Sequence, residues 1–160
     1  MPIPSSITEF LQGRPYEVVT HRTAFTAQEE AAATHVPGRE WAKTVVCLAD
    51  EQPILAVLPA HYQVDLERLR KLAGAATIRL AMEREVSALY PSCETGAVPP
   101  LGPLFGHRVF VDKVIASDAE IAFHAGTHVD AVRMRYADLA EIDSPTVGEF
   151  GLAPGRRHEH

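Results

Sequence analysis

The sequence contains few cysteines, no long hydrophobic run and no excess of basic charge, and each of these features excludes a class of protein. Its 160 residues include only two cysteines, Cys47 and Cys93, which lie far apart without a Cys-x-x-Cys pair. Neither a disulfide framework nor a zinc knuckle is expected, and Cys47 is predicted to be a buried free thiol. The longest apolar stretches fall far short of the roughly 20 residues that a membrane-spanning helix needs. Because the N-terminus also lacks the features of a secretory signal, we expect a cytoplasmic protein with no membrane partner.

The formal net charge of −6 argues against a protein that coats nucleic acid, since such binding relies on many Lys and Arg contacts to phosphates. A local nucleic-acid site remains compatible with this charge. Basic side chains gather at Arg68, Arg70, Lys71, Arg79 and Arg84. They indicate either a solvated helix face or such a local site.

Several catalytic motifs are missing from the sequence. It has no Gly-x-Ser-x-Gly elbow, no Walker loop and no Gly-x-Gly-x-x-Gly after a strand. The sequence therefore lacks the motifs that a serine hydrolase, a nucleotide triphosphatase or a dehydrogenase of these types requires. His124 and His128 have the spacing of zinc ligands on a helix, but Gly126 intervenes at a predicted strand end and no third ligand is evident. We therefore expect no metal and no other cofactor.

The composition is that of an ordinary globular domain, with 46% hydrophobic and 22% charged residues. A chain of 160 residues fits one domain comfortably, and no repeat or linker divides it. We predict a single domain over residues 1–151 and a polar tail over residues 152–160.

The pattern of apolar residues, caps and breakers predicts helices and strands in mixed order. Helices are expected at residues 5–11, 26–35, 66–73, 83–89 and 136–142, and strands at residues 16–21, 41–49, 54–58, 77–80, 108–115, 120–124 and 131–134. Residues 50–53 should join the second and third strands as a hairpin, and residues 94–103 should form a loop without regular structure. The order favours an α/β fold with a mixed, partly antiparallel sheet and flanking helices.

Three segments are candidates for a functional site. Lys43 interrupts an apolar strand near its start, where an ammonium could enter a cleft and hold a phosphate or polarise an ester carbonyl, or could simply extend to water. Gly96–Pro100 is a stiff loop that could hold backbone groups toward a ligand or serve as a structural turn. A third segment, His124–His128, lies at the end of a strand. Alternation would put His124 and Gly126 on one side and Phe123 and Ala125 on the other, so the segment could form a cleft wall.

Together these segments resemble the YbaK-like aminoacyl-tRNA deacylases, the family that includes the editing domain inserted in bacterial prolyl-tRNA synthetases and its free-standing relatives. The resemblance covers most of the chain, and the order and spacing of its parts are more specific than any one part. Its parts are Phe25–Ala32, the strand with Lys43, Leu66–Ala81, Gly96–Gly102, Ala125–Gly126 and Ala137–Leu139.

The resemblance also implies roles for individual residues. Lys43 matches the lysine that the family requires for editing, and Gly96–Pro100 matches the Gly-x-x-x-Pro loop that positions the misattached aminoacyl group. His124 departs from the family, because relatives often have a small residue there, and this leaves its role open. The expected substrate-binding residues are Phe25, Gly96, Ala97, Val98, Pro99, Pro100, His124, Gly126, Thr127 and His128.

The function implied by the resemblance is trans-editing, the hydrolysis of the ester that joins a small amino acid to a mischarged tRNA, above all proline tRNA. The expected partners are the acceptor end of that tRNA, gripped by Arg68, Lys71 or Arg79, and prolyl-tRNA synthetase. Lys43 would anchor the ester or a terminal phosphate while water or a neighbouring substrate hydroxyl attacks. The alternative is a catalytically inactive module that binds aminoacyl-tRNA or a synthetase.

Overall fold

The computed structural model describes residues 5–20, 40–94 and 96–154. The predicted helix at residues 26–35 lies outside these ranges, as does Phe25. The helices are α1 (Ser5–Leu11), α3 (Leu66–Ala73), α4 (Glu83–Leu89), α5 (Gly102–Phe105), α6 (Lys113–Ala116) and α7 (Tyr136–Asp143). The strands are β1 (Glu17–Thr20), β2 (Ala42–Ala49), β3 (Gln52–Pro59), β4 (Gln63–Val64), β5 (Ile78–Leu80), β6 (Arg108–Asp112), β7 (Glu120–His124), β8 (Asp130–Arg135), β9 (Thr146–Gly148) and β10 (Gly151–Leu152).

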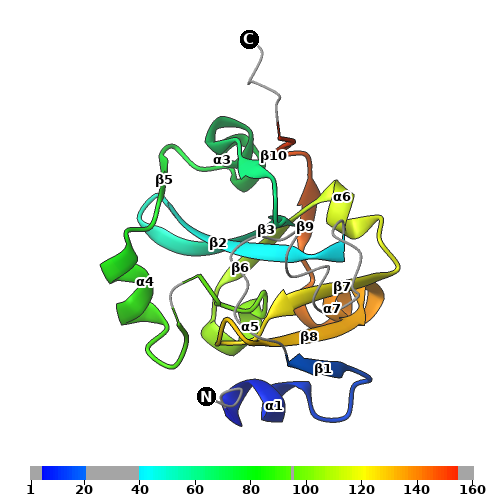
Figure 1. Ribbon diagram of the computed structural model, residues 1–160. Helices are drawn as coiled ribbons and strands as arrows, with labels where there is room; N and C mark the ends of the chain where they lie inside the picture. Colours follow the sequence, from blue (N-terminus) through cyan, green and yellow to red (C-terminus); the bar gives the residue numbers. More distant parts are fainter. Residues whose placement is uncertain (1–4, 21–39, 95, 155–160) are drawn as a thin grey trace.

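The described strands form a five-stranded sheet in the order β5-β2-β3-β6-β9, a three-stranded sheet in the order β1-β8-β7, and the pair β10-β4. In the larger sheet β2 is antiparallel to β3 and β5, whereas β6 is parallel to β3 and β9. This mixed α/β arrangement confirms the predicted fold class. Figure 1 shows α3 on one side of the β2–β3 hairpin and the β1-β8-β7 sheet on the other.

The β2–β3 hairpin is confirmed, with a tighter turn than predicted. Its register runs from Ala42 opposite Pro59 to Ala49 opposite Gln52, so that Asp50 and Glu51 alone make the turn. Both turn residues have positive φ, 50° and 64°, as the turns that match the strand twist require. The Asp50 carboxylate accepts hydrogen bonds from the backbone N–H groups of Ala76 and Thr77, at 3.0 and 2.9 Å.

Helix α3 begins and ends at the residues that its caps predict. The Asp65 side chain accepts a hydrogen bond from the Arg68 N–H at 3.1 Å, and Gly74 has a left-handed conformation with φ of 68°. Leu69 is fully buried against the sheet, in a cluster that contains Cys47 and Phe110. Cys47 is thus the buried free thiol that its sequence context predicts.

A second apolar cluster fills the space between the five-stranded and the three-stranded sheets. The strand β2 therefore packs against α3 through one cluster and against the three-stranded sheet through the other. Val46 on β2 and Val57 on β3 pack in this cluster with Phe123 and Val132 from β7 and β8. An isolated parallel bridge between Trp41 and Ala122 links the start of β2 to β7. This bridge brings the start of β2 next to β7, an edge strand of the three-stranded sheet.

Two elements differ from the sequence predictions. The strand expected over residues 108–115 ends at Asp112, because that side chain accepts a hydrogen bond from the Val114 N–H at 2.9 Å and caps α6. The loop expected over residues 94–103 ends early, because α5 begins at Gly102 with Pro103 in its first turn, where proline is tolerated.

The predictions also omitted the short strands β4, β9 and β10. Leu152 of β10 pairs with Gln63 of β4, so the paired chain extends past residue 151. Within the part of the chain that the structure describes, no helix is both long and apolar enough to cross a membrane.

Candidate functional site

The loop Gly96–Pro100 and the turn His124–His128 are joined by backbone hydrogen bonds, although they lie far apart in the sequence. The Glu94 N–H donates to the Gly126 carbonyl at 2.7 Å, and the Gly126 N–H donates to the Ala97 carbonyl at 2.8 Å. The Ala97 N–H in turn donates to the Glu94 carbonyl at 2.9 Å. These bonds make the two predicted segments one structural unit, which we call the loop–turn unit (residues 94, 96–100 and 124–128).

The Gly96–Pro100 loop combines an exposed glycine with a buried remainder. Gly96 has φ of +85°, a conformation that favours glycine. A Cβ atom at Gly96 would lie 3.3 Å from Cε1 of His128, so the imidazole rests directly against this glycine. Ala97, Val98, Pro99 and Pro100 are all buried. The loop therefore presents Gly96 at the surface with a rigid, packed chain behind it.

The turn that follows β7 has its own internal support. The Thr127 hydroxyl donates to the Asp130 carboxylate at 2.8 Å and accepts from the Asp130 N–H at 3.0 Å, and both residues are buried. Gly126 has φ of 91°. Because β7 ends at His124, the strand alternation expected to continue to Gly126 is wrong. The polar groups of Thr127 and Asp130 hold the turn in shape.

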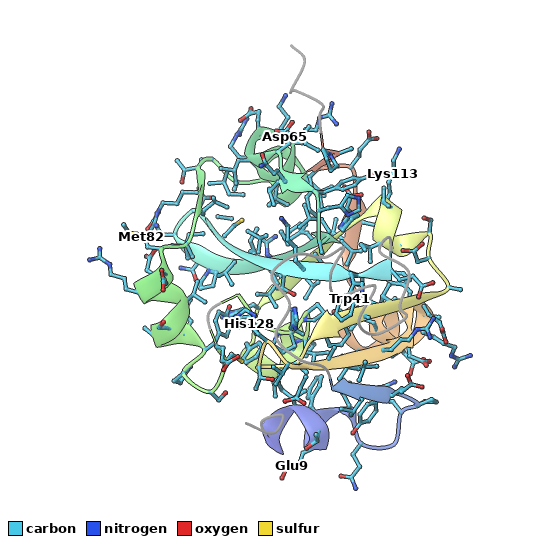
Figure 2. All side chains as sticks on the ribbon, viewed as in Figure 1. Glu9, Trp41, Asp65, Met82, Lys113 and His128 are labelled. Carbon is cyan, nitrogen blue, oxygen red and sulfur yellow. The ribbon has the colours of Figure 1, made fainter. Side chains whose placement is uncertain are left out.

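His124 lies between Trp41 and His128 in a row of three rings. Its ring centroid is 5.7 Å from that of Trp41 and 5.5 Å from that of His128. Trp41 is 1% exposed, whereas both histidines are partly exposed. Figure 2 labels Trp41 where β2 approaches β7. The row therefore connects the start of β2 to the loop–turn unit.

Lys43 lies on β2 opposite Leu58, two residues after Trp41, which is about 7 Å along an extended strand. The side chain is half-buried, and this burial lowers the pKa of its ammonium below the usual 10.5. Among the residues that the structure describes, no carboxylate lies within ion-pair distance of Lys43. A partly desolvated cation without a described counter-ion is suited to an anionic or polarised ligand group.

The structure thus brings together most of the residues that the sequence singled out. Gly96–Pro100 and His124–His128 form one unit, and Trp41 joins that unit to the strand that carries Lys43. Phe25 lies outside the described residues. Trp41 and Glu94 belong to this arrangement but were not predicted as site residues, because single side chains beside a strand or loop carry no motif.

The basic residues on and after α3 do not form a free cationic surface. Three of the arginines make ion pairs: Arg68 with Asp65 and Glu149, Arg70 with Glu67, and Arg79 with Glu51 and Glu85. Lys71 and Arg84 are exposed. The pairing favours the interpretation of this group as a solvated face, and it reduces the charge that Arg68 and Arg79 could offer to phosphates.

Comparison with known proteins finds relatives of similar length and relatives that are much longer. The chain is 29% identical over 144 residues to the multifunctional Ser/Thr-tRNA deacylase ProXp-y of Escherichia coli K12, with 87% of this chain and 86% of that protein covered. It is 31% identical over 129 residues to the proline–tRNA ligase of Nitratidesulfovibrio vulgaris Hildenborough, covering 74% of this chain and 22% of the ligase.

The fold has a close counterpart among solved structures. The crystal structure of a putative trans-editing enzyme for prolyl tRNA synthetase superposes with a TM-score of 0.81 at 23% identity, covering 94% of this chain and 98% of the other. The family model for the aminoacyl-tRNA editing domain matches residues 21–142, a range that includes Lys43 and the whole loop–turn unit. The chain therefore belongs to the aminoacyl-tRNA editing domain family.

Proposed function

We propose that this protein is a free-standing, trans-editing deacylase that hydrolyses the ester of a tRNA mischarged with a small amino acid, with proline tRNA as the first candidate. The observation that carries the proposal is the position of Lys43, a half-buried lysine near the ring row that leads to the loop–turn unit. Membership of the editing-domain family supplies the class of reaction.

In this proposal Lys43 acts as an electrostatic anchor and not as a proton acceptor. Its ammonium holds the ester carbonyl or the terminal phosphate, so that negative charge developing on the carbonyl oxygen is stabilised. An aminoacyl ester is more reactive than a peptide, and positioning with charge stabilisation allows water or a substrate hydroxyl to attack. When water attacks, the carbonyl carbon gains the water oxygen and its bond to the ribose oxygen breaks. The ribose oxygen takes up the proton that the water releases, so the products are the free amino acid and the free hydroxyl of the tRNA.

The Gly96–Pro100 loop serves as the wall beside the aminoacyl group. Pro99 and Pro100 have no N–H, so at this end of the loop the backbone offers only carbonyl groups to a ligand. His124 and His128 are proposed to line the part of the site next to this loop, since both residues are partly exposed and the His128 ring lies against Gly96. We propose that Thr127 and Gly126 act by shaping the turn.

The proposal also covers which amino acid is removed from the tRNA and which protein is the partner. The Escherichia coli relative is named for serine and threonine, so these esters are candidates beside alanine and cysteine. A pocket rejects one additional methylene by only about 1–3 kcal/mol, so more than one small amino acid should be accepted. Because a related segment lies within a proline–tRNA ligase, prolyl-tRNA synthetase is the proposed partner in trans.

A panel of charged tRNAs tests the proposed function. Proline tRNA carrying alanine, cysteine, serine, threonine or proline, together with seryl- and threonyl-tRNA, is incubated with the protein, and ester loss is compared with a no-enzyme control. We expect at least one small mischarged ester to be hydrolysed well above the control while prolyl-tRNA survives. If every ester decayed at the uncatalysed rate, the inactive binding module would replace the deacylase.

Replacing Gly96 by alanine is expected to impair both stability and hydrolysis. The positive φ of +85° costs a non-glycine residue about 1 kcal/mol, and the new Cβ would crowd the His128 ring at 3.3 Å. We expect a melting temperature lower by about 2–4 °C and a lower deacylation rate. Gly106→Ala is the matched control, because Gly106 has φ of +75° but, in the described part of the chain, no neighbouring group within 4 Å of where its Cβ would lie. Equal loss of rate in both variants would show that the contact between Gly96 and His128 does not matter.

A further inference from the structure

The residue that precedes the Gly96–Pro100 loop, Glu94, makes a contact that the proposed function does not use. Its Oε1 atom accepts a hydrogen bond from the His128 N–H at 2.6 Å, across 34 positions of sequence. The same residue donates its own N–H to the Gly126 carbonyl at 2.7 Å and accepts from the Ala97 N–H at 2.9 Å. Glu94 therefore holds the turn through both its side chain and its backbone.

The side-chain bond acts directly on the backbone of His128. A carboxylate that accepts from an N–H forms a charge-assisted hydrogen bond, which is shorter and stronger than a neutral one. It anchors the backbone of His128 at the point from which the imidazole extends over Gly96. Because the His128 ring also contacts the His124 ring at 5.5 Å between centroids, displacement of His128 would disturb both histidines.

The surroundings of Glu94 indicate that its side chain fixes the turn locally and contributes little to the stability of the whole fold. The residue is exposed, so it contributes little buried apolar area to stability. The turn has independent internal bonds between Thr127 and Asp130, which remain when the Glu94 side chain is removed. Loss of the carboxylate should therefore leave the turn folded but less well fixed against the loop.

We propose that Glu94 is a positioning residue of the editing site, which fixes His128 against the Gly96–Pro100 loop without touching the substrate. The proposal rests on the deacylase function proposed above. A displacement of about 1 Å in a positioned group can slow a reaction by up to about 100-fold, so even a modest shift of His128 should be measurable.

The test compares Glu94→Ala with Glu94→Gln in the full chain, using the ester that the intact protein hydrolyses fastest. We expect Glu94→Ala to lower kcat by roughly tenfold with little change in KM, since positioning is lost but tRNA binding is not. Glu94→Gln keeps an acceptor oxygen and should recover most of the rate. Hydrogen exchange at the His128 amide should quicken in Glu94→Ala and be restored in Glu94→Gln.

Asp50→Ala is the matched control, because Asp50 is another exposed carboxylate that accepts backbone hydrogen bonds, from Ala76 and Thr77. Its positive φ of 50° makes alanine at least as costly there as at position 94. We expect Asp50→Ala to lower the melting temperature but not kcat. Unchanged kcat or unchanged His128 exchange in Glu94→Ala would overturn the positioning role alone, as would an equal fall in kcat in both alanine variants. Inactivity of the intact protein would overturn the proposed function, and with it this role.

Discussion

Lys43→Ala is expected to slow ester hydrolysis by roughly 100-fold, the largest rate effect that we predict for a single residue. Removal of one group that stabilises developing charge in an active site typically costs about 10²- to 10³-fold in kcat. Lys43 is half-buried, and the lowered pKa of its ammonium reflects desolvation, so its charge is less screened than that of a surface lysine. The measurement is kcat and KM for the best mischarged tRNA of the panel.

Two further substitutions separate charge from shape at this position. Lys43→Met keeps a similar length without the charge and should be as slow as Lys43→Ala. Lys43→Arg keeps the charge with a different geometry and should retain part of the rate. Lys113→Ala is the control, because Lys113 is an exposed lysine at the start of α6 and its removal should leave kcat unchanged. Full activity of Lys43→Met would remove charge stabilisation from the mechanism.

The pH dependence of the rate provides a second test of the same residue. Burial lowers the pKa of Lys43 below 10.5, so the ammonium loses its proton at a lower pH than a surface lysine does. If the charged form is the active one, the enzymatic rate should fall as the pH rises toward that lowered pKa, after the uncatalysed alkaline hydrolysis is subtracted. The fall should be absent in Lys43→Arg, because arginine stays protonated throughout this range.

Asp143→Asn is expected to remove a large pH dependence of stability. Burial raises the pKa of the Asp143 carboxyl to about 7, against an opposing hydrogen bond from the Gly102 N–H. Asp143 is 8% exposed, its Oδ1 accepts from Gly102 at 3.2 Å, and its Oδ2 has no hydrogen-bond partner among the described residues. The folded protein therefore keeps a proton on Asp143 at pH values where the unfolded chain has released it.

The sign of the effect follows from that difference in bound protons. Below about pH 4 both states hold the proton, and between about pH 4 and about pH 7 the folded state binds more than the unfolded state. The free energy of unfolding therefore falls as the pH rises through this window, and the loss is complete above about pH 7. A shift from 3.8 to about 7 corresponds to a loss on the order of 4 kcal/mol if it is expressed in full.

Urea unfolding of the intact protein and of Asp143→Asn at about pH 5.5 and about pH 8.5 measures this contribution. The difference between the two proteins isolates Asp143 from His107, whose pKa burial lowers and which therefore has the opposite pH dependence. Asparagine keeps an acceptor for the Gly102 N–H but cannot ionise, so its stability relative to the intact protein should rise with pH. A difference that stays constant between the two pH values would contradict the raised pKa.

Local structure proved to be the most predictable part of this protein. Helix α3 begins after Asp65 and ends at Gly74, as the cap residues predict, because a cap is made by side-chain and backbone groups only a few positions apart. The β2–β3 hairpin was equally predictable from two apolar runs separated by a short polar turn. The candidate residue Lys43 was visible as a single charge in one of these runs.

Contacts across long stretches of sequence were not predictable in this way. Asp112 was taken as the interior of a strand, but its carboxylate caps α6 and also accepts from the Phe150 and Gly151 N–H groups, at 3.1 and 2.7 Å. The parallel pairing of β6 with β9 and the pairing of β10 with β4 likewise depend on chain segments that meet only in the folded protein. Such short strands carry too few residues to show a periodic pattern.

The candidate site shows the same division between sequence and tertiary structure. The residue types of Lys43, Gly96–Pro100 and His124–His128 were evident from the sequence, since charge in an apolar strand and a Gly-Pro loop are local features. Tertiary structure alone decided that Gly126 bonds to Ala97, that Trp41 and His124 connect β2 to the turn, and that Glu94 holds His128. These contacts join groups that are 29 or more residues apart, and they form only when segments distant in the sequence pack together, which no local pattern specifies.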